Sequence, residues 1–216
     1  MTHRTRIKIC GLTREADLDA AVAAGADAVG FVLYPKSPRA VTIARAAELA
    51  RRLPPFVTPV ALFVNAEPAE IAAACAAIPT LLLQFHGDET PAQCALPGRP
   101  FLRAARMSPG VDLLDFGQRF AAAQAILLDA HVDGYGGGGK VFDWSLVPSS
   151  AAALPPLVLS GGLNAANVTD GIRALRPFAV DVSSGVESAI KGIKDAEAIR
   201  RFCDAVRTAD AMINAS

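Results

Sequence analysis

The 216-residue sequence has no excess of charge of either sign, because 21 basic side chains balance 21 acidic ones. It contains no basic stripe that would bind nucleic acid and no run of Lys and Arg that would bind an anionic membrane. Its apolar runs are of strand length, far short of the about 20 residues that a helix needs to cross a bilayer. These absences predict that neither nucleic acid nor a membrane is a partner.

Cysteine is also scarce. The chain has four cysteines, and no two of them form a CxxC pair: Cys10, Cys75, Cys94 and Cys203. This spacing argues against a disulfide framework and against a zinc site, so we expect no metal. The opening residues, MTHRTRIKIC, hold no apolar stretch of signal-peptide length, which favours a cytoplasmic location.

Apolar residues, in contrast, make up 52% of the chain, enough for a packed core. Short strand-like runs alternate with alanine-rich stretches of helical composition. Eight such runs predict strands at 6–10, 28–33, 58–64, 80–85, 100–105, 125–129, 156–160 and 178–182.

The stretches between these runs carry helix start and stop signals. Pro68 and Pro91 stand where a first helical turn would begin, and Gly25 would end the first helix. The weakest helical signal follows the 125–129 run. The candidate N-caps are Thr13, Thr42, Asn164 and Asp195.

Strict alternation of strand and helix predicts parallel strands joined by right-handed crossovers. Eight units in 216 residues, about 27 each, favour a closed (β/α)8 barrel over an open doubly wound sheet. No linker-like change of composition divides the chain, so we expect one α/β domain spanning residues 1–216.

The phase of the first strand places polar groups inside this barrel. Side chains alternate along a strand, and the two isoleucines of RIKIC need apolar partners among the helices. Lys8 and Cys10 then face the interior, where a charge must be paired. Asp181 stands between two valines near the end of the eighth strand and can also point inward.

Polar residues close five of the eight strands. Active sites of such barrels lie at the carboxyl ends of the strands. A structural protein does not need reactive groups gathered there, whereas an enzyme or a binding protein does. These strand-end residues are Cys10, Gln84 with His86, Asp129, Ser160, and Ser183 with Ser184.

Glycine-containing loops follow the last two strands, LSGGLN and VSSGVE. Backbone N–H groups at Gly161, Gly162 and Gly185 could converge on an anion, and barrels often bind phosphate at this place. Tight turns alone would explain either loop. The two together favour a phosphate site, and hence a phosphorylated small molecule as partner.

A third glycine-rich segment, DGYGGGGKVFDW (133–144), follows the sixth strand. Its four consecutive glycines are typical of a mobile connection. Composition leaves two interpretations open: a plain linker, or a lid over 133–142 that closes on substrate.

Taken in order, the motifs resemble one family closely, phosphoribosylanthranilate isomerase of tryptophan biosynthesis. Single glycine motifs are weak, but the ordered set spans nearly the whole chain. The matching pieces are KICGLT (8–13), SPR (37–39), QFHG (84–87), LLDA (127–130), GGGGKVFDW (136–144), LSGGL (159–163), and DVSSGVE with GIKD (181–195).

The resemblance implies an Amadori rearrangement of N-(5′-phosphoribosyl)anthranilate, the third step from chorismate to tryptophan, with no metal or organic cofactor. It implies that Cys10 is the general base and Asp129 the general acid. It also implies that Arg39 binds the anthranilate carboxylate and that Asp181 contacts sugar hydroxyls. The implied phosphate loops contain Gly161, Gly162, Ser183, Ser184 and Gly185. From their place at the end of the fourth strand, we expect Gln84 and His86 to bind the substrate as well. Gly138 departs from the family, which usually has a hydroxyl residue there.

The reaction itself asks for an acid and a base on opposite sides of the sugar. The ring oxygen must gain a proton so that the ring opens, and C2′ must then lose one. Burial of Asp129 would favour its protonated form. A cation such as Lys8 would favour the thiolate of Cys10, and we hypothesise that it acts directly or through a bridging carboxylate such as Asp181.

Three other interpretations are weaker. The related histidine-pathway isomerase resembles a duplicated half-barrel with aspartates in both catalytic positions, but here Cys10 occupies the first. Indole-glycerol-phosphate synthase would add a lysine acid and a longer N-terminus. A non-catalytic barrel that binds a phosphorylated metabolite would not need the Cys10–Asp129 pair. We expect a monomer, with a homodimer as the alternative, because no long exposed apolar element stands out.

Overall fold

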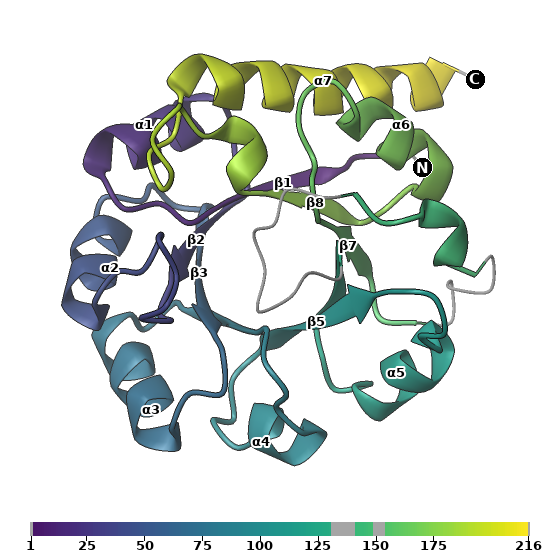
Figure 1. Ribbon diagram of the computed structural model, residues 1–216. Coiled ribbons are helices and arrows are strands. Elements are labelled where there is room, and N and C mark those ends of the chain that lie inside the picture. Colours follow the sequence, from purple (N-terminus) through teal and green to yellow (C-terminus); the bar gives the residue numbers. More distant parts are fainter. Residues whose placement is uncertain (1, 131–140, 149–153, 216) are drawn as a thin grey trace.

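The computed structural model describes residues 2–130, 141–148 and 154–215, so most of the proposed lid (133–142), including Gly138, lies outside the described residues. Eight parallel strands form a closed barrel in chain order (Figure 1). Residue pairs such as Arg6 with Ala179 join the first strand to the last, which excludes an open sheet. The strands are β1 (Arg6–Cys10), β2 (Ala28–Val32), β3 (Thr58–Phe63), β4 (Leu82–Phe85), β5 (Phe101–Met107), β6 (Ala125–Ala130), β7 (Leu157–Leu159) and β8 (Ala179–Val182).

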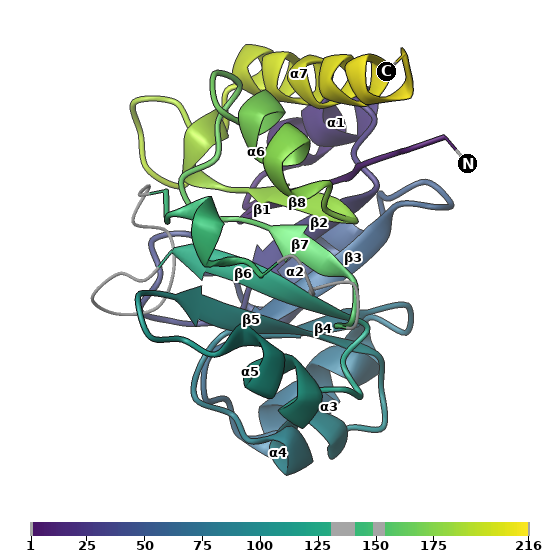
Figure 2. The ribbon, with the colours of Figure 1, turned by 90° about the vertical axis from the view of Figure 1, so that its right-hand side faces the viewer.

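Helices surround the barrel. Those among the described residues are α1 (Glu15–Ala23), α2 (Ile43–Ala50), α3 (Pro68–Ala77), α4 (Pro91–Ala95), α5 (Leu113–Arg119), α6 (Val168–Leu175) and α7 (Ala196–Ala215). The 20-residue α7 lies along α1 and α6 on one side of the barrel (Figure 2). Within the described part, the β6–β7 connection holds only the 3-10 helix η1 (Trp144–Leu146), where the helical signal was weakest. A second short 3-10 helix, η3 (Ser184–Val186), follows β8.

Most of the predicted helix signals are confirmed. The Thr42 hydroxyl accepts a hydrogen bond from the Arg45 N–H and caps α2. Pro68 and Pro91 open α3 and α4. Gly25 follows α1 with a φ of 81°, the left-handed conformation that suits a helix end.

Two predicted N-caps are wrong. The N-cap of α1 is Arg14, and the Thr13 hydroxyl instead donates to the carbonyl of Gly192, because the loop after β8 lies within its reach. The N-cap of α6 is Asn167, and the Asn164 side chain accepts from the Ala166 N–H in the preceding turn.

The core has two apolar layers, one on each side of the barrel wall. The larger lies between strands and helices and contains Ile7 and Ile9, which confirms the predicted phase of β1. The smaller fills the barrel interior. Its buried members are Val60, Leu102, Ala104, Ala125, Leu127, Val158 and Ala179. Lys8 and Cys10 alternate with the isoleucines and are buried on the inner face.

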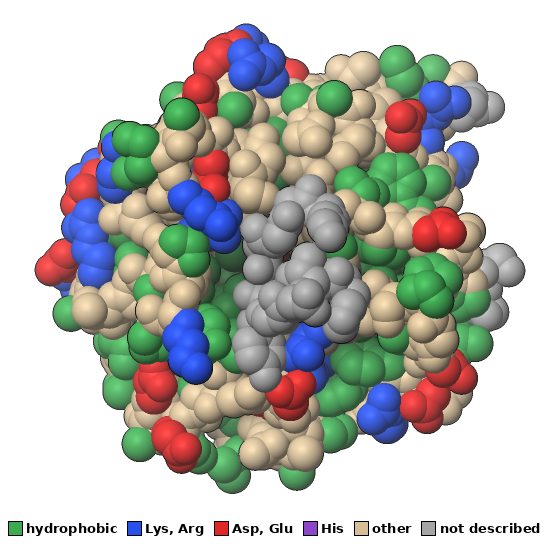
Figure 3. All heavy atoms as spheres, viewed as in Figure 1, with side chains coloured by type: hydrophobic (Ala, Val, Ile, Leu, Met, Phe, Trp, Pro, Cys, Tyr) green, Lys and Arg blue, Asp and Glu red, His purple; other side chains and the backbone are tan. Residues whose placement is uncertain are grey.

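Leu127 in the inner layer stands two residues before Asp129, so β6 changes from apolar filling to a polar group as it reaches its carboxyl end. Acidic and basic side chains are mixed around the face viewed along the barrel axis (Figure 3). No helix in the described ranges is long and apolar enough to span a membrane.

Candidate active site

Strands β1 and β8 bring a buried ion pair into the barrel. Lys8 and Asp181 are register partners, and 2.8 Å separates Lys8 Nζ from Asp181 Oδ2. Both side chains are only 5% exposed, so each charge depends on the other for compensation. The second oxygen, Asp181 Oδ1, is buried and accepts no hydrogen bond from the described residues. It is therefore an unused acceptor for a ligand hydroxyl.

Cys10 ends β1 beside this pair. Burial raises the pKa of the Cys10 thiol above its ordinary value, and the positive charge of Lys8 opposes that rise. Lys8 thus acts in the direction that the sequence suggested, but burial is the larger effect. The Asp181 carboxylate raises the pKa further, so it does not act as a bridge that favours thiolate. Burial therefore favours the neutral thiol over the thiolate.

The other three cysteines lie in helices α3, α4 and α7, away from the strand ends. Burial raises the pKa of both the Cys94 and the Cys203 thiol to about 11. Among the described residues neither of these two thiols lies beside a buried lysine as Cys10 does, which is the environment of a structural cysteine.

A glycine faces the Cys10 thiol. Gly30 on β2 is the register partner of Cys10, and a Cβ built on it would lie 2.7 Å from Cys10 Sγ. A larger residue would displace the thiol. This contact could not be predicted from the sequence, because the two residues belong to different strands.

On the opposite side of the barrel, β4 and β6 bring three predicted residues into a hydrogen-bonded chain. Gln84 Nε2 lies 3.2 Å from His86 Nδ1, and His86 Nε2 lies 2.9 Å from Asp129 Oδ2. All three side chains are buried. A carboxamide NH2 can only donate, so Nδ1 accepts and the Nε2–H of His86 donates to the Asp129 carboxylate. The sequence predicted Gln84 and His86 at the end of one strand, but not that they reach Asp129.

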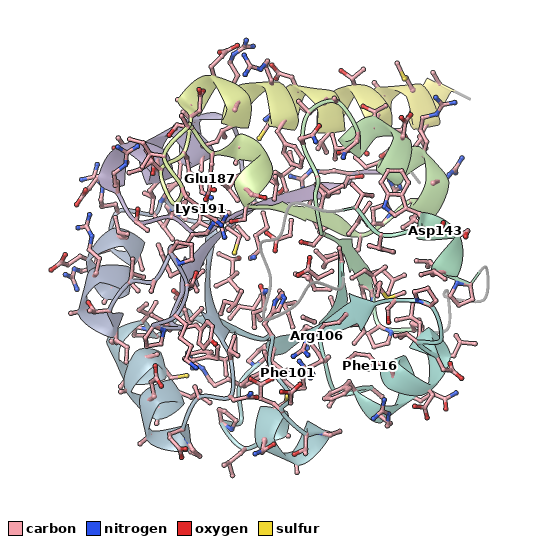
Figure 4. The ribbon with its side chains drawn as sticks, in the orientation of Figure 1. Phe101, Arg106, Phe116, Asp143, Glu187 and Lys191 are labelled. Carbon is pink, nitrogen blue, oxygen red and sulfur yellow. The ribbon has the colours of Figure 1, made fainter. Side chains whose placement is uncertain are left out.

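Arg39, in the loop after β2, is buried and forms an ion pair. Its Nε and Nη2 donate to the two carboxylate oxygens of Glu187, at 2.6 and 2.9 Å. Lys194 Nζ lies 3.2 Å from Glu187 Oε1 and 3.0 Å from the Ser183 carbonyl oxygen. Glu187 follows η3, and Figure 4 shows it near the rim of the barrel, across the opening from Arg106.

Sequence reasoning missed Glu187 and Lys194. Both lie in the quoted motifs DVSSGVE and GIKD, but no role was assigned to them. The available signal was two opposite charges in a segment that follows the last strand without a helical pattern.

The two glycine loops after β7 and β8 touch. A Cβ at Gly185 would come within 1.8 Å of the Leu163 carbonyl oxygen, so only glycine permits this approach. Gly161 and Gly162 have φ angles of 78° and 65°, and within the described ranges their N–H groups donate to no backbone carbonyl. Ser183 Oγ donates to the Cys10 carbonyl at 3.1 Å, which ties this region to the end of β1.

Comparison with known proteins gives a consistent result. The sequence model of a family described as N-(5′-phosphoribosyl)anthranilate (PRA) isomerase matches residues 7–205. The N-(5′-phosphoribosyl)anthranilate isomerase of Methylibium petroleiphilum is 78% identical over 213 residues, which covers 99% of each chain.

Two solved structures are also similar. One is a phosphoribosylanthranilate isomerase in complex with reduced 1-(o-carboxyphenylamino)-1-deoxyribulose 5-phosphate, with 39% identity and a TM-score of 0.82 over 94% of this chain and 99% of the other. The second contains mutually generated monomers of the dimeric phosphoribosylanthranilate isomerase from Thermotoga maritima, with 38% identity and a TM-score of 0.84 over the same shares.

Proposed function

The chain belongs to the N-(5′-phosphoribosyl)anthranilate isomerase family, and we propose that Cys10 and Asp129 carry out the two proton transfers of its reaction. The enzyme converts N-(5′-phosphoribosyl)anthranilate to 1-(o-carboxyphenylamino)-1-deoxyribulose 5-phosphate, a step of tryptophan biosynthesis. The observation that carries the assignment is that β1 and β6, well apart around the closed barrel, end in these two buried groups.

Asp129 protonates the furanose ring oxygen. The C1′–O bond breaks, its electron pair becomes the new hydroxyl, and the aniline nitrogen supplies electrons to form the iminium. Asp129 must carry a proton before this step, and the Nε2 of His86, 2.9 Å from Asp129 Oδ2, holds the carboxyl group in place by a hydrogen bond. Gln84 holds His86 from the other side, which keeps the imidazole in place between turnovers.

Cys10 then removes the proton from C2′, and the iminium accepts the electron pair to give an enolamine that tautomerises to the ketone. Burial raises the pKa of the thiol, so the thiolate is a minor species near neutrality but a strong base when it forms. Lys8 favours that thiolate, and the free oxygen of Asp181 is available to a sugar hydroxyl.

Arg39 binds the anthranilate carboxylate, because its planar fork matches two carboxylate oxygens. The phosphate lies against Gly161, Gly162, Ser183, Ser184 and Gly185. Support comes from the contact between the two loops and from the N–H groups of Gly161 and Gly162, which no backbone carbonyl occupies among the described residues.

Residues 1–216 act as one domain, as a monomer, in the cytoplasm. Four free cysteines favour a reducing compartment. Among the described residues, the large exposed apolar side chains, such as Phe56 and Met212, are scattered along the sequence, which favours a monomer. A dimer mass in sedimentation equilibrium would overturn the monomer. Two unfolding transitions would overturn the single domain, and recovery outside the cytoplasmic fraction would overturn the location.

The assignment of roles is tested with the fluorescence of the anthranilate substrate. Purified protein should consume the fluorescent substrate, and substitution of Cys10 or Asp129 should abolish turnover while binding of the reduced product analogue persists. A variant at either position that turns over at a near-native rate would refute its role.

A further inference from the structure

We propose that Glu187 is a positioning residue: it holds the guanidinium of Arg39 so that only the outer edge of the fork faces the substrate carboxylate. This inference rests on the proposed role of Arg39 in binding that carboxylate. Glu187 touches no substrate in this account and acts through Arg39.

The geometry of the Arg39–Glu187 pair defines which edge of the guanidinium remains for a ligand. A guanidinium has two edges that can bind a carboxylate with two hydrogen bonds, one formed by Nε and an Nη, and one formed by both Nη atoms. Glu187 occupies the first edge, with bonds of 2.6 and 2.9 Å. The second edge remains for a ligand, and the plane of the guanidinium is fixed.

The stem of Arg39 is held as firmly as its head. Gly11 has a φ of 76°, and a Cβ on it would come within 2.6 Å of Arg39 Cδ, so the stem passes directly over this glycine. A Cβ at Gly192 would lie 2.9 Å from the Pro38 carbonyl oxygen. The Pro38–Arg39 segment is therefore closely packed against the residue that follows β1 and against the segment after β8.

The charges around Arg39 leave room for one anion. Arg39 and Lys194 bring two formal positive charges to a single carboxylate, that of Glu187. Burial works against ionisation of Glu187, but Arg39 and Lys194 lower its pKa below the ordinary value. Burial lowers the pKa of Lys194, and the Glu187 carboxylate opposes that change. With Lys194 protonated, the group carries one net positive charge, which a bound carboxylate would neutralise.

The test compares two ligands by titration calorimetry: the reduced product analogue, reduced 1-(o-carboxyphenylamino)-1-deoxyribulose 5-phosphate, and the same compound with phenyl in place of o-carboxyphenyl. In Glu187→Gln, we expect the carboxylate ligand to bind at least about tenfold more weakly, while the phenyl ligand changes by less than about twofold. Charge alone predicts the opposite, because removing an anion should tighten carboxylate binding. Tighter binding, or equal loss for both ligands, overturns the proposal.

Two further variants separate orientation from charge and from folding. Glu187→Gln/Lys194→Met restores the net charge without the oriented pair, and it should show the same selective loss. If Glu187→Gln does not fold, this double variant decides the question. Glu197→Gln is the matched control, because Arg200 donates to Glu197 through Nε and Nη2 in the same way on the exposed surface of α7.

Arg39→Ala distinguishes failure of this inference from failure of the proposed function. If Arg39 does not bind the carboxylate, Arg39→Ala weakens both ligands equally or neither. If it does, but Glu187 does not position it, Arg39→Ala is selective and Glu187→Gln is not. When both statements hold, Glu187→Gln has no further effect on carboxylate binding in the Arg39→Ala background.

Discussion

The Cys10 side and the Asp129 side of the barrel rim each transfer one proton in the proposed reaction, but their surroundings differ. The Cys10 side is built from buried ion pairs, one between Lys8 and Asp181 and one between Arg39 and Glu187. The Asp129 side is a hydrogen-bonded chain that runs through His86 to Gln84. One side tunes a group by electrostatics, and the other holds a group by direct contact.

The difference follows from the chemistry of each side. A buried thiol resists ionisation, so a base made from it needs a nearby cation to offset burial. A carboxyl group that must donate a proton needs a partner that holds it in the position from which it reaches the substrate. On the Cys10 side, a charge acts over a distance, so its effect on the thiol survives small shifts of the groups. On the Asp129 side, each hydrogen bond needs close contact and is lost when one partner is removed.

The largest effect should come from removing the reacting group on either side. We expect Cys10→Ala and Asp129→Asn each to lower kcat by about two to four orders of magnitude, the usual range for positioned acid–base groups. Loss of substrate fluorescence measures kcat, and circular dichroism checks the fold. If kcat fell in only one of the two variants, the residue replaced in the other would not carry out a proton transfer.

Arg39→Ala should have the next largest effect. Loss of a charge-assisted contact to the substrate should lower kcat/KM by about tenfold to a hundredfold, mainly through KM. Steady-state kinetics over a range of substrate concentrations separates the two constants. If kcat falls and KM stays the same, Arg39 acts on the chemical step instead.

His86→Asn should lower kcat by about tenfold with little change in KM, because the imidazole is hydrogen-bonded to Asp129, the proposed acid. Gln84→Ala, one step farther along the chain, should have a smaller effect of the same kind. A KM effect larger than the kcat effect in His86→Asn would show that the imidazole binds substrate directly.

The smallest predicted change concerns the pH dependence. Because burial raises the Cys10 pKa, kcat/KM should rise with pH from neutrality, and Lys8→Met should move that rise to still higher pH. The thiolate absorbance of a variant without the other three cysteines reports the same pKa. Exposed Lys36→Met is the control, and an unchanged thiol pKa in Lys8→Met would remove Lys8 from the account.

The sequence predicted the fold and the inward face of β1, because alternating apolar residues report which face is buried. Lys8 and Asp181 could be suggested as partners for the same reason. The Arg39–Glu187 pair could not, since 148 residues separate them and only the closed barrel brings them together. Thr13 is another long-range contact that the sequence did not reveal: its hydroxyl donates to the carbonyl of Gly192 instead of capping a helix. Local patterns do not record such long-range contacts.

The separate roles of Cys10 and Asp129 are tested most directly by a deuterium isotope effect on kcat, with substrate deuterated at C2′. We expect a large primary effect in Cys10→Ser, where removal of the C2′ proton limits the rate. In Asp129→Asn we expect an effect close to one, because ring opening comes first and becomes limiting. A large effect in Asp129→Asn with none in Cys10→Ser would contradict the assignment of base and acid.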